Sequence, residues 1–298
     1  MTAAIEVRHL TRRHGDTLAL DGVTTSFEEH AIHGLLGRNG AGKSTLMSLI
    51  TGQDFPTSGE VQVFGQAPHE NEHVLSRISF IREAQRYFDD FKARHAFSAA
   101  ADAYPHWDQN LAEELAEEFR VPEKTRIKKM SHGQRSAVGV ITGIASRAEL
   151  TLFDEPYVGL DAVARQLFYD RLLADYAEHP RTVIISSHLI DEISHLIENV
   201  VLIDQGKLLL DEPAEQLRGR AVTLVGPAHR VREAVGTRTV LSTEQLGRTA
   251  RTTVMGGFSD AERAELHRAE IDITPVSLQQ LVVHLTTTRS TTSEEAVR

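Results

Sequence analysis

The chain has 298 residues, of which 41% are hydrophobic and 25% charged, and its formal net charge at pH 7 is −10. This composition is typical of a globular protein with one large and one small domain, or with two domains. The negative charge argues against a broad nucleic-acid-binding surface, and the absence of cysteine excludes disulfides, thiol catalysis and cysteine-ligated zinc. No apolar run approaches the roughly 18 residues of a membrane span, and no signal-peptide pattern is present, so any membrane role is expected to need a partner.

Strand and helix patterns alternate over the first 219 residues. Strands are predicted over 5–7, 23–27, 32–36, 61–64, 77–81, 150–153, 182–186 and 200–204, and helices over 43–51, 110–119, 131–146, 162–177 and 190–197. This alternation predicts an α/β fold with a largely parallel sheet that is covered on both faces. Between about 84 and 148 strand signals are absent, which predicts a helical subdomain.

A smaller pattern begins at residue 220. Strands are predicted over 222–225, 240–241, 252–255 and 271–273, and helices over 231–235, 261–269 and 278–285. The β-α-β-β-α-β order predicts a small α+β domain of the split βαβ kind over 220–298. From about residue 286 the chain is rich in Thr and Ser, and we expect this tail to be disordered.

A glycine-rich loop lies between the predicted strand 32–36 and the helix that follows it. Its residues are Gly37, Arg38, Asn39, Gly40, Ala41, Gly42, Lys43, Ser44 and Thr45. The glycines allow consecutive backbone N–H groups to face a phosphate, and the helix dipole favours the same anion. Lys43 can reach the β- and γ-phosphates, and the Ser44 hydroxyl can ligate Mg²⁺. The loop therefore predicts a nucleotide-binding P-loop.

Two carboxylates, Asp154 and Glu155, end the apolar strand 150–153. In a P-loop protein the Asp at this place holds Mg²⁺, often through water, and the Glu can polarise the attacking water. Many strands end in acidic turns, so the pair alone is a weak indication of function. It becomes a strong one because a P-loop lies about 110 residues before it. We expect Asp154 to be a metal residue and Glu155 a catalytic one.

Three further motifs accompany the P-loop and the acidic pair. They are Ser131-His132-Gly133-Gln134 at the start of a helix, Gly159-Leu160-Asp161, and Ser186-Ser187-His188 at the end of a strand. In this order, over about residues 4–218, they resemble the signature motif, the D-loop and the switch histidine of the ATP-binding cassette (ABC) ATPases. The resemblance implies a P-loop NTPase (RecA-like, ABC-type) core over 1–219, with an antiparallel β edge and the helical subdomain.

In this family two cassettes pack head to tail, so that the signature of each closes over the ATP of the other. The resemblance implies that Ser131 and Gly133 contact a γ-phosphate across that interface. A helix N-terminus with a Ser hydroxyl and a Gly N–H is also a suitable anion site by itself. His132 stands where the family usually has Gly, and Gln134 is retained.

The resemblance also implies roles for two residues near the acidic pair. His188 would hydrogen-bond the γ-phosphate and hold the attacking water and Glu155 in line, which makes it a catalytic candidate. A histidine at a strand end could instead cap or satisfy a loop. Asp161 would organise the dimer contact.

Two positions depart from the family pattern. His14 stands where an aromatic residue often stacks on adenine; an imidazole stacks more weakly, and a solvent-facing turn histidine fits equally well. Glu83 stands where the glutamine of the Q-loop is expected to reach Mg²⁺ and the attacking water. Gln85 lies two residues further on, so a local shift of the motif stays open.

Aromatic residues gather between positions 80 and 107. Some of them form the core of the helical subdomain, but in the family this face also receives a coupling helix of the membrane subunit. We expect Tyr87, Phe88 and Phe91 to contribute to that contact. The segment 104–108, together with Glu83, further resembles the small single-cassette ATPases of bacterial multidrug or antibiotic-response exporters.

The resemblance as a whole implies an ATPase subunit of an ABC transporter of the exporter type that uses ATP and Mg²⁺. It would be cytoplasmic, attached to the inner face of the cell membrane through separate transmembrane permease subunits, and paired with an identical or related second cassette. No nucleic-acid partner is expected. The alternative is a soluble regulatory or mechanical ABC-type ATPase without a permease, but ribosome-acting members usually carry two cassettes and DNA-acting members insert long coiled coils.

Overall fold

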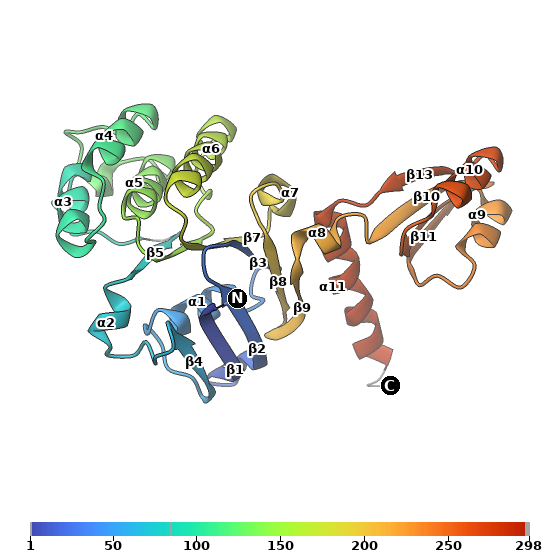
Figure 1. Ribbon diagram of the computed structural model, residues 1–298, viewed down its shortest axis with the longest axis horizontal. Helices are drawn as coiled ribbons and strands as arrows, with labels where there is room; N and C mark the ends of the chain where they lie inside the picture. Colours follow the sequence, from blue (N-terminus) through green and yellow to red (C-terminus); the bar gives the residue numbers. More distant parts are fainter. Residues whose placement is uncertain (1, 84, 296–298) are drawn as a thin grey trace. The chain divides into compact units, whose positions relative to one another are not determined.

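The computed structural model describes residues 2–83 and 85–295 and divides into two compact units (Figure 1). The first unit comprises residues 1–188 and 195–211, and the second comprises 189–194 and 212–298. The first unit therefore ends earlier than the predicted boundary at residue 219. The short segment 189–194 also groups with the second unit, which the linear sequence pattern does not indicate.

A six-stranded sheet forms the centre of the first unit, in the order β5-β6-β7-β3-β8-β9. Its strands are β3 (Ile32–Leu36), β5 (Ile78–Arg82), β6 (Leu150–Asp154), β7 (Thr182–Ser187), β8 (Asn199–Asp204) and β9 (Lys207–Pro213). Strand β3 pairs in parallel with β7 and β8, and β6 pairs in parallel with β5 and β7. Every residue of β3, β6 and β7 is buried, as expected for parallel strands covered on both faces. The predicted largely parallel sheet is confirmed.

A second, antiparallel sheet of order β2-β1-β4 forms the predicted β edge. Strands β1 (Ala3–His14) and β2 (Thr17–Glu28) are much longer than predicted, and β4 spans Ser58–Val63. Polar residues on the exposed face of the hairpin hide this length from an apolar pattern. Helix α1 (Lys43–Ile50) lies between the sheets, because one buried apolar cluster includes residues of both sheets and of α1, among them Phe27, Leu46 and Leu152.

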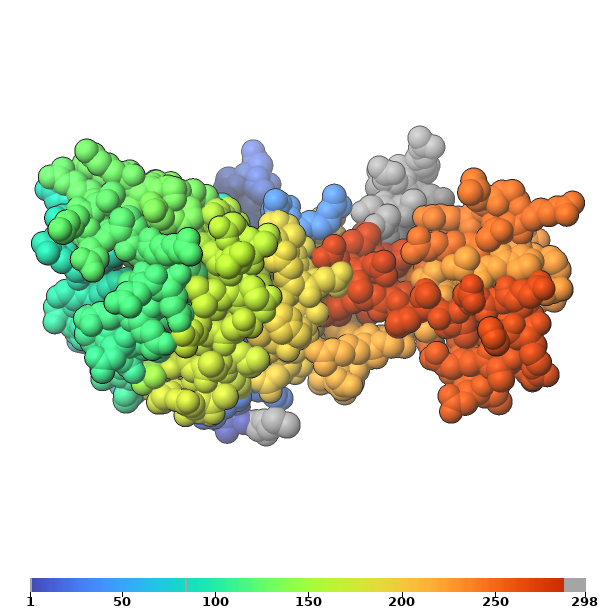
Figure 2. Space-filling model, turned by 90° about the horizontal axis from the view of Figure 1, so that it is seen from above, coloured from blue at the N-terminus to red at the C-terminus, as the bar shows by residue number. Residues whose placement is uncertain are grey.

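The helical subdomain predicted over about 84–148 is present as α3, α4 and α5 (Figure 1). The bounds of the remaining elements of this unit are α2 (Glu72–Leu75), α3 (Ala93–Ala103), α4 (Gln109–Glu118), η1 (Ile127–Lys129), α5 (His132–Ala145) and α6 (Ala162–Glu178). Helix α5 packs against α3, α4 and α6. In Figure 2 the green and yellow-green atoms of this part of the chain lie against one another on the face that is seen. In the described part of the chain, no helix is both long and apolar enough to cross a membrane.

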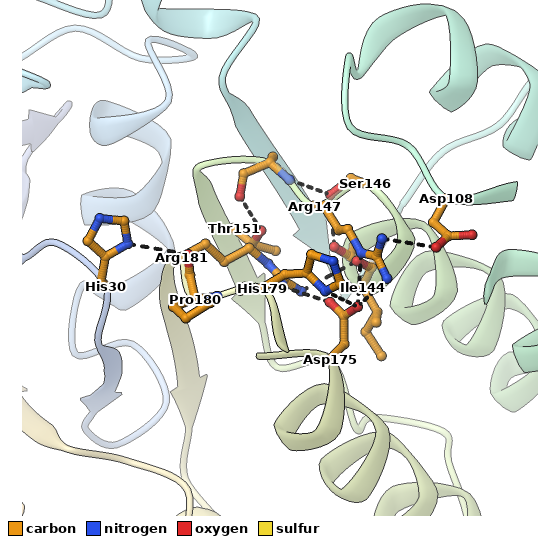
Figure 3. Close-up of polar contacts among 12 residues, drawn as sticks. His30, Asp108, Ile144, Ser146, Arg147, Thr151, Asp175, His179, Pro180 and Arg181 are labelled. Carbon is orange, nitrogen blue, oxygen red and sulfur yellow. Dashed lines mark hydrogen bonds and ion pairs between the residues drawn. The ribbon is translucent and has the colours of Figure 1, made fainter. Parts of the chain in front are cut away.

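A buried ion-pair cluster joins α6 to the beginning of β7 and to the segment between α5 and β6 (Figure 3). The Asp175 carboxylate accepts hydrogen bonds from Arg181 Nη1 at 2.7 Å and from Arg147 Nε at 3.0 Å. Arg147 also pairs with Asp108 at 2.9 Å, and Asp108 caps α4. The side chains of Asp175 and Arg181 are each only 4% exposed, so water does not solvate either charge and each depends on the other as its counter-ion.

The second unit contains a four-stranded antiparallel sheet in the order β11-β12-β10-β13. Its elements are β10 (Ala221–Pro227), α9 (Ala228–Val235), β11 (Val240–Leu246), β12 (Thr249–Met255), α10 (Asp260–Arg268) and β13 (Asp272–Pro275), with α7 (Ile190–Ile193), α8 (Ala214–Leu217) and α11 (Leu278–Glu295). The strand and helix order is the predicted β-α-β-β-α-β. An apolar core lies between the sheet and the helices α9 and α10.

Helix α11 corrects the expectation of a disordered tail from residue 286, because the helix continues to Glu295. The Thr286 hydroxyl donates back to the carbonyls of Val282 and Val283 at 3.0 and 3.1 Å, a local bond by which Thr is accommodated inside a helix. The other end is fixed by Asp191 of α7, whose carboxylate accepts from Gln279 N at 3.2 Å. Residues 296–298 of the predicted tail lie outside the described residues.

Candidate functional site

The carboxyl ends of four parallel strands bring the predicted motifs to one edge of the six-stranded sheet. Asp154 at the end of β6 is in register with Ser186 of β7, and Leu36 at the end of β3 is in register with Ser187. Strand β5 ends beside them, with Arg82 opposite Asp154. Residues that follow these strands therefore meet at the edge where parallel α/β sheets bind their ligands.

The P-loop wraps the space between β3 and α1. Gly42 has φ +111°, and a Cβ atom there would lie 2.6 Å from the carbonyl oxygen of Ala19, so only glycine fits. Lys43 is buried, and its Nζ donates to the carbonyl of Gly37 at 2.8 Å, while Ser44 is exposed at the first turn of α1. A hollow of about 490 Å³ opens here, lined by Arg38, Asn39, Gly40, Ala41, His188, Asp204 and Gln205.

One serine hydroxyl holds both acidic residues. Ser186 Oγ donates to Asp154 Oδ1 at 2.8 Å and accepts from the backbone N–H of Glu155 at 2.9 Å. Glu155 has φ +50°, a left-handed conformation that is costly for a residue with a Cβ and that is retained where surrounding contacts hold the backbone, as the bond to Ser186 does here. Its Oε1 lies 3.2 Å from Lys43 Nζ, so the catalytic candidate and the P-loop lysine are in direct contact.

Tyr157 and His188 complete this group. The Tyr157 hydroxyl donates to Glu155 Oε2 and lies 3.0 Å from His188 Nδ1, which is itself 2.7 Å from the same carboxylate oxygen. Burial, with the hydrogen bond to Glu155 as the next contribution, raises the pKa of Tyr157 far above its ordinary value, so the phenol keeps its proton. Sequence reasoning missed Tyr157 and the role of Ser186; the available signals were the place of Tyr157 two residues after Glu155 and that of Ser186 two residues before His188.

The signature residues are placed on another element, at the N-terminus of α5. Ser131 Oγ accepts from the backbone N–H of Gln134 at 3.2 Å, and Gln134 Oε1 accepts from the backbone N–H of Ser131 at 3.0 Å, forming a capping box. A Cβ at Gly133 would lie 2.5 Å from the carbonyl oxygen of Gly159, so this glycine is required by close packing within the chain.

Glu83 and His132 line a hollow of about 300 Å³ that is separate from the P-loop hollow. Its other lining residues include Ile81, Arg82, Gln85, Arg86, Arg135, Ser136, Gly139 and Pro156. The Gln85 amide oxygen accepts from the backbone N–H of Arg82 at 3.5 Å, so it turns back on its own loop. The structure thus joins Lys43, Glu155 and His188 but leaves Glu83 and the signature residues apart from them.

The remaining candidates occupy peripheral positions. His14 Nε2 lies 3.7 Å from Asp54 Oδ2 near the β1–β2 turn, and Asp161 caps α6 by accepting from Ala164 N at 2.8 Å. Among the aromatic residues expected at a partner contact, Phe88 is 77% exposed and its ring centre lies 5.1 Å from that of Phe91. Tyr87 is half-buried.

Comparisons with known proteins agree with this arrangement. The family model described as "ABC transporter" matches residues 20–158. The bacitracin transport ATP-binding protein BcrA of Bacillus licheniformis is 30% identical over 223 residues, 74% of this chain and 73% of that protein. The ABC transporter ATP-binding protein YtrB of Bacillus subtilis (strain 168) is 28% identical over 216 residues, 71% of this chain and 74% of that protein.

A solved structure with a similar fold is a dimeric ATP-binding cassette in a post-hydrolysis state with ADP and Pi. It has a TM-score of 0.62 and 20% identity, and the match covers 70% of this chain and 98% of that one. At this identity the likeness concerns the fold, and it confirms the predicted P-loop cassette.

Proposed function

Because this chain belongs to the ABC transporter family, as an ATP-binding subunit with ATPase activity, we propose that it hydrolyses ATP in a head-to-tail dimer. The observation that carries the proposal is the separation of two sets of groups on one chain. Lys43, Glu155 and His188 lie together, whereas the signature lies at the start of α5, where its His132 lines another hollow. A second cassette can bring its signature to the P-loop that the chain's own signature does not reach.

The P-loop half binds the nucleotide. The exposed backbone around Gly40 and the N-terminus of α1 supply N–H groups to phosphate, and Lys43 leaves Glu155 for the β- and γ-phosphates. The oxygen groups present, the Ser44 hydroxyl and the Asp154 carboxylate, fit Mg²⁺, which is commonly held by one or two carboxylates together with substrate phosphates. Mg²⁺ supplies charge neutralisation at the transferring phosphoryl group.

The hydrolytic group is Glu155, released by Lys43 and still held at Oε2 by its neighbours. Its free oxygen then orients the attacking water and accepts its proton. His188, exposed at the rim of the P-loop hollow, contacts the γ-phosphate and stays linked to Glu155. Asp161, the cap of α6, lies on the segment after Glu155 and contributes to the dimer contact.

The subunit works on the inner face of the cell membrane, with separate permease subunits, in an exporter. The likeness to the bacitracin transport ATP-binding protein supports a peptide antibiotic or a similar amphipathic compound as cargo. The exposed Phe88 and its neighbour Phe91 offer an apolar contact for a permease segment. No observation favours the alternative of a soluble regulatory or mechanical ABC-type ATPase without a permease, whereas the relatives named above are ATP-binding proteins of transporters.

A mixing experiment tests the head-to-tail arrangement. Lys43→Ala abolishes ATP binding in its own subunit, and Ser131→Ala removes the group that closes over the partner's ATP, so each homodimer is expected to be inactive. In a one-to-one mixture half of the dimers are mixed and each carries one intact site. ATPase activity of the mixture is therefore expected to return to about a quarter of wild type.

The matched control mixes Lys43→Ala with Glu155→Gln. Both substitutions affect the same half of a composite site, so no intact site forms and no activity is expected. Ser131→Asp serves as a second signature variant, because Asp preserves the α5 cap while its charge repels phosphate. Recovery in the control mixture, or none in the first mixture with either Ser131 variant, would contradict the arrangement.

Glu83 has its own expected effect on the Mg²⁺ requirement. We propose that ATP-driven closure draws Glu83 to the metal, where it adds a negative charge to those of Asp154 and Glu155. Without the cation these three carboxylates repel one another. Closure of the dimer should therefore depend more strongly on Mg²⁺ with Glu83 than with a neutral glutamine at the same position. A carboxylate beside the metal binds Mg²⁺ more tightly than a neutral amide does, so in a Mg²⁺ titration of ATPase activity Glu83→Gln is expected to need about two- to fivefold more Mg²⁺ to reach the half-maximal rate.

The titration is done with the chain alone and with its membrane partner. Gln85→Ala is the control, since Gln85 bonds only to its own loop among the contacts described. Superimposable curves for wild type and Glu83→Gln in both settings would rule Glu83 out as the residue that approaches the metal. A changed curve for Gln85→Ala alone would assign the role to Gln85.

A further inference from the structure

Tyr157 lies at the centre of the hydrolytic group although neither the P-loop nor the acidic pair includes it. The residue is 3% exposed, and its ring meets the His188 ring edge-on, with the ring centres 5.6 Å apart. Besides its bond to Glu155, the phenol oxygen accepts from the backbone N–H of His188 at 3.1 Å and from Ser187 Oγ at 3.2 Å. The hydroxyl therefore touches both of the residues proposed to act on the γ-phosphate and water.

The direction of these hydrogen bonds follows from the groups involved. A carboxylate only accepts, so the single phenol proton is donated to Glu155 Oε2. The bonds from the backbone of His188 and from Ser187 fix the phenol oxygen from the other side. With the ring buried and its oxygen held by two donors, the hydroxyl has one orientation, and that orientation points at Glu155.

The two oxygens of Glu155 are thereby given different tasks. Oε2 is held by Tyr157 and by His188 Nδ1, whereas Oε1 faces Lys43 of the P-loop. When phosphate attracts Lys43, Oε1 becomes the free oxygen, and the fixed Oε2 prevents the carboxylate from rotating. A carboxylate held at one oxygen presents the other in a defined position to the attacking water.

We propose that Tyr157 is a positioning residue for ATP hydrolysis, which holds the Glu155 carboxylate and links it to His188. The proposal rests on the proposed role of Glu155 and adds the group that orients it. Tyr157 itself touches neither phosphate nor water in this scheme. A tyrosine that served only to fill the space behind β6 would need its ring but not its hydroxyl, which gives the two roles different experimental signatures.

The test is Tyr157→Phe in the full chain, which keeps the buried ring and removes only the hydroxyl. We expect kcat for ATP hydrolysis to fall by about 10- to 100-fold, with KM for Mg–ATP within about twofold of wild type. The matched control is Tyr176→Phe, since the Tyr176 hydroxyl also donates to a carboxylate, that of Glu198 at 3.0 Å, but outside the site. The control is expected to leave kcat and KM unchanged.

A double-mutant cycle with Glu155→Gln separates this proposal from the role of Glu155. If Tyr157 acts through Glu155, Tyr157→Phe causes no further loss in the Glu155→Gln background, because the group that it orients is gone. Losses that multiply, or a Tyr157→Phe kcat within twofold of wild type, would overturn the proposal while leaving Glu155 catalytic. A Tyr157→Phe chain that no longer binds ATP would overturn it too, since the hydroxyl would then maintain the loop. Wild-type activity of Glu155→Gln alone would instead refute the proposed function.

Discussion

Glu155→Gln is expected to lower ATP turnover by about 10²- to 10⁴-fold while leaving ATP affinity close to that of wild type. The glutamine has the same shape and can still accept hydrogen bonds from Tyr157 and His188, but its amide cannot take a proton from water. Lys43, which contacts Glu155 Oε1 at 3.2 Å, also loses its counter-ion. ATP should therefore bind without being hydrolysed and hold two chains together.

The effect is measured by steady-state ATPase rates and by size-exclusion chromatography in the presence of ATP and Mg²⁺. In the chromatography the variant should elute as a dimer, whereas wild type should return to the monomer as ATP is consumed. Glu149→Gln is the control at the opposite end of β6, where the carboxylate pairs with Arg77 at 2.6 Å. It should leave turnover unchanged. A Glu155→Gln chain with wild-type turnover would show that another group activates the water.

Asp175→Ala is expected to lower the free energy of unfolding of the first unit by about 3–5 kcal/mol. The substitution leaves Arg181 buried, with its Nη1 still near the carbonyl of His179 but without a carboxylate. Arg147 loses one of its two acidic partners and keeps Asp108. A buried guanidinium without a counter-ion is costly because the protein interior replaces water poorly.

Urea denaturation followed by fluorescence measures this effect in the first unit, because Trp107 is the chain's one tryptophan and belongs to that unit. Glu60→Ala is the control: its ion pair with Arg8 is about half exposed on both sides, so water screens it and its loss should change the free energy of unfolding little. The double variant Asp175→Ala/Arg181→Met removes both charges and should regain part of the loss. If Asp175→Ala costs no more than Glu60→Ala, the cluster does not stabilise the unit.

The phosphate-binding loop and the order of the motifs could be read from the sequence because they depend on consecutive residues. Gly42, Lys43 and Ser44 act through backbone conformation and helix position, which local sequence specifies. Asp154 and Glu155 follow a buried strand, and the ends of parallel strands meet at one edge whatever the loops between them contain. The second unit's strand and helix order was likewise predictable from short apolar runs and turns.

Side-chain contacts over long sequence separations were decided only by the tertiary structure. Ser186 reaches Asp154, Tyr157 reaches His188, and Arg147 reaches Asp175 because parallel pairing and helix packing bring distant segments together. Hydrophobic periodicity does not predict such contacts. A serine or tyrosine has the same local sequence pattern whether it is an inert core residue or donates a hydrogen bond to a catalytic carboxylate. The length of β1 and the helix after residue 286 also depended on pairing and on hydrogen bonds that composition does not reveal. The sequence thus determined which chemistry this protein carries, and the packing of its strands decided which side chains hold that chemistry in place.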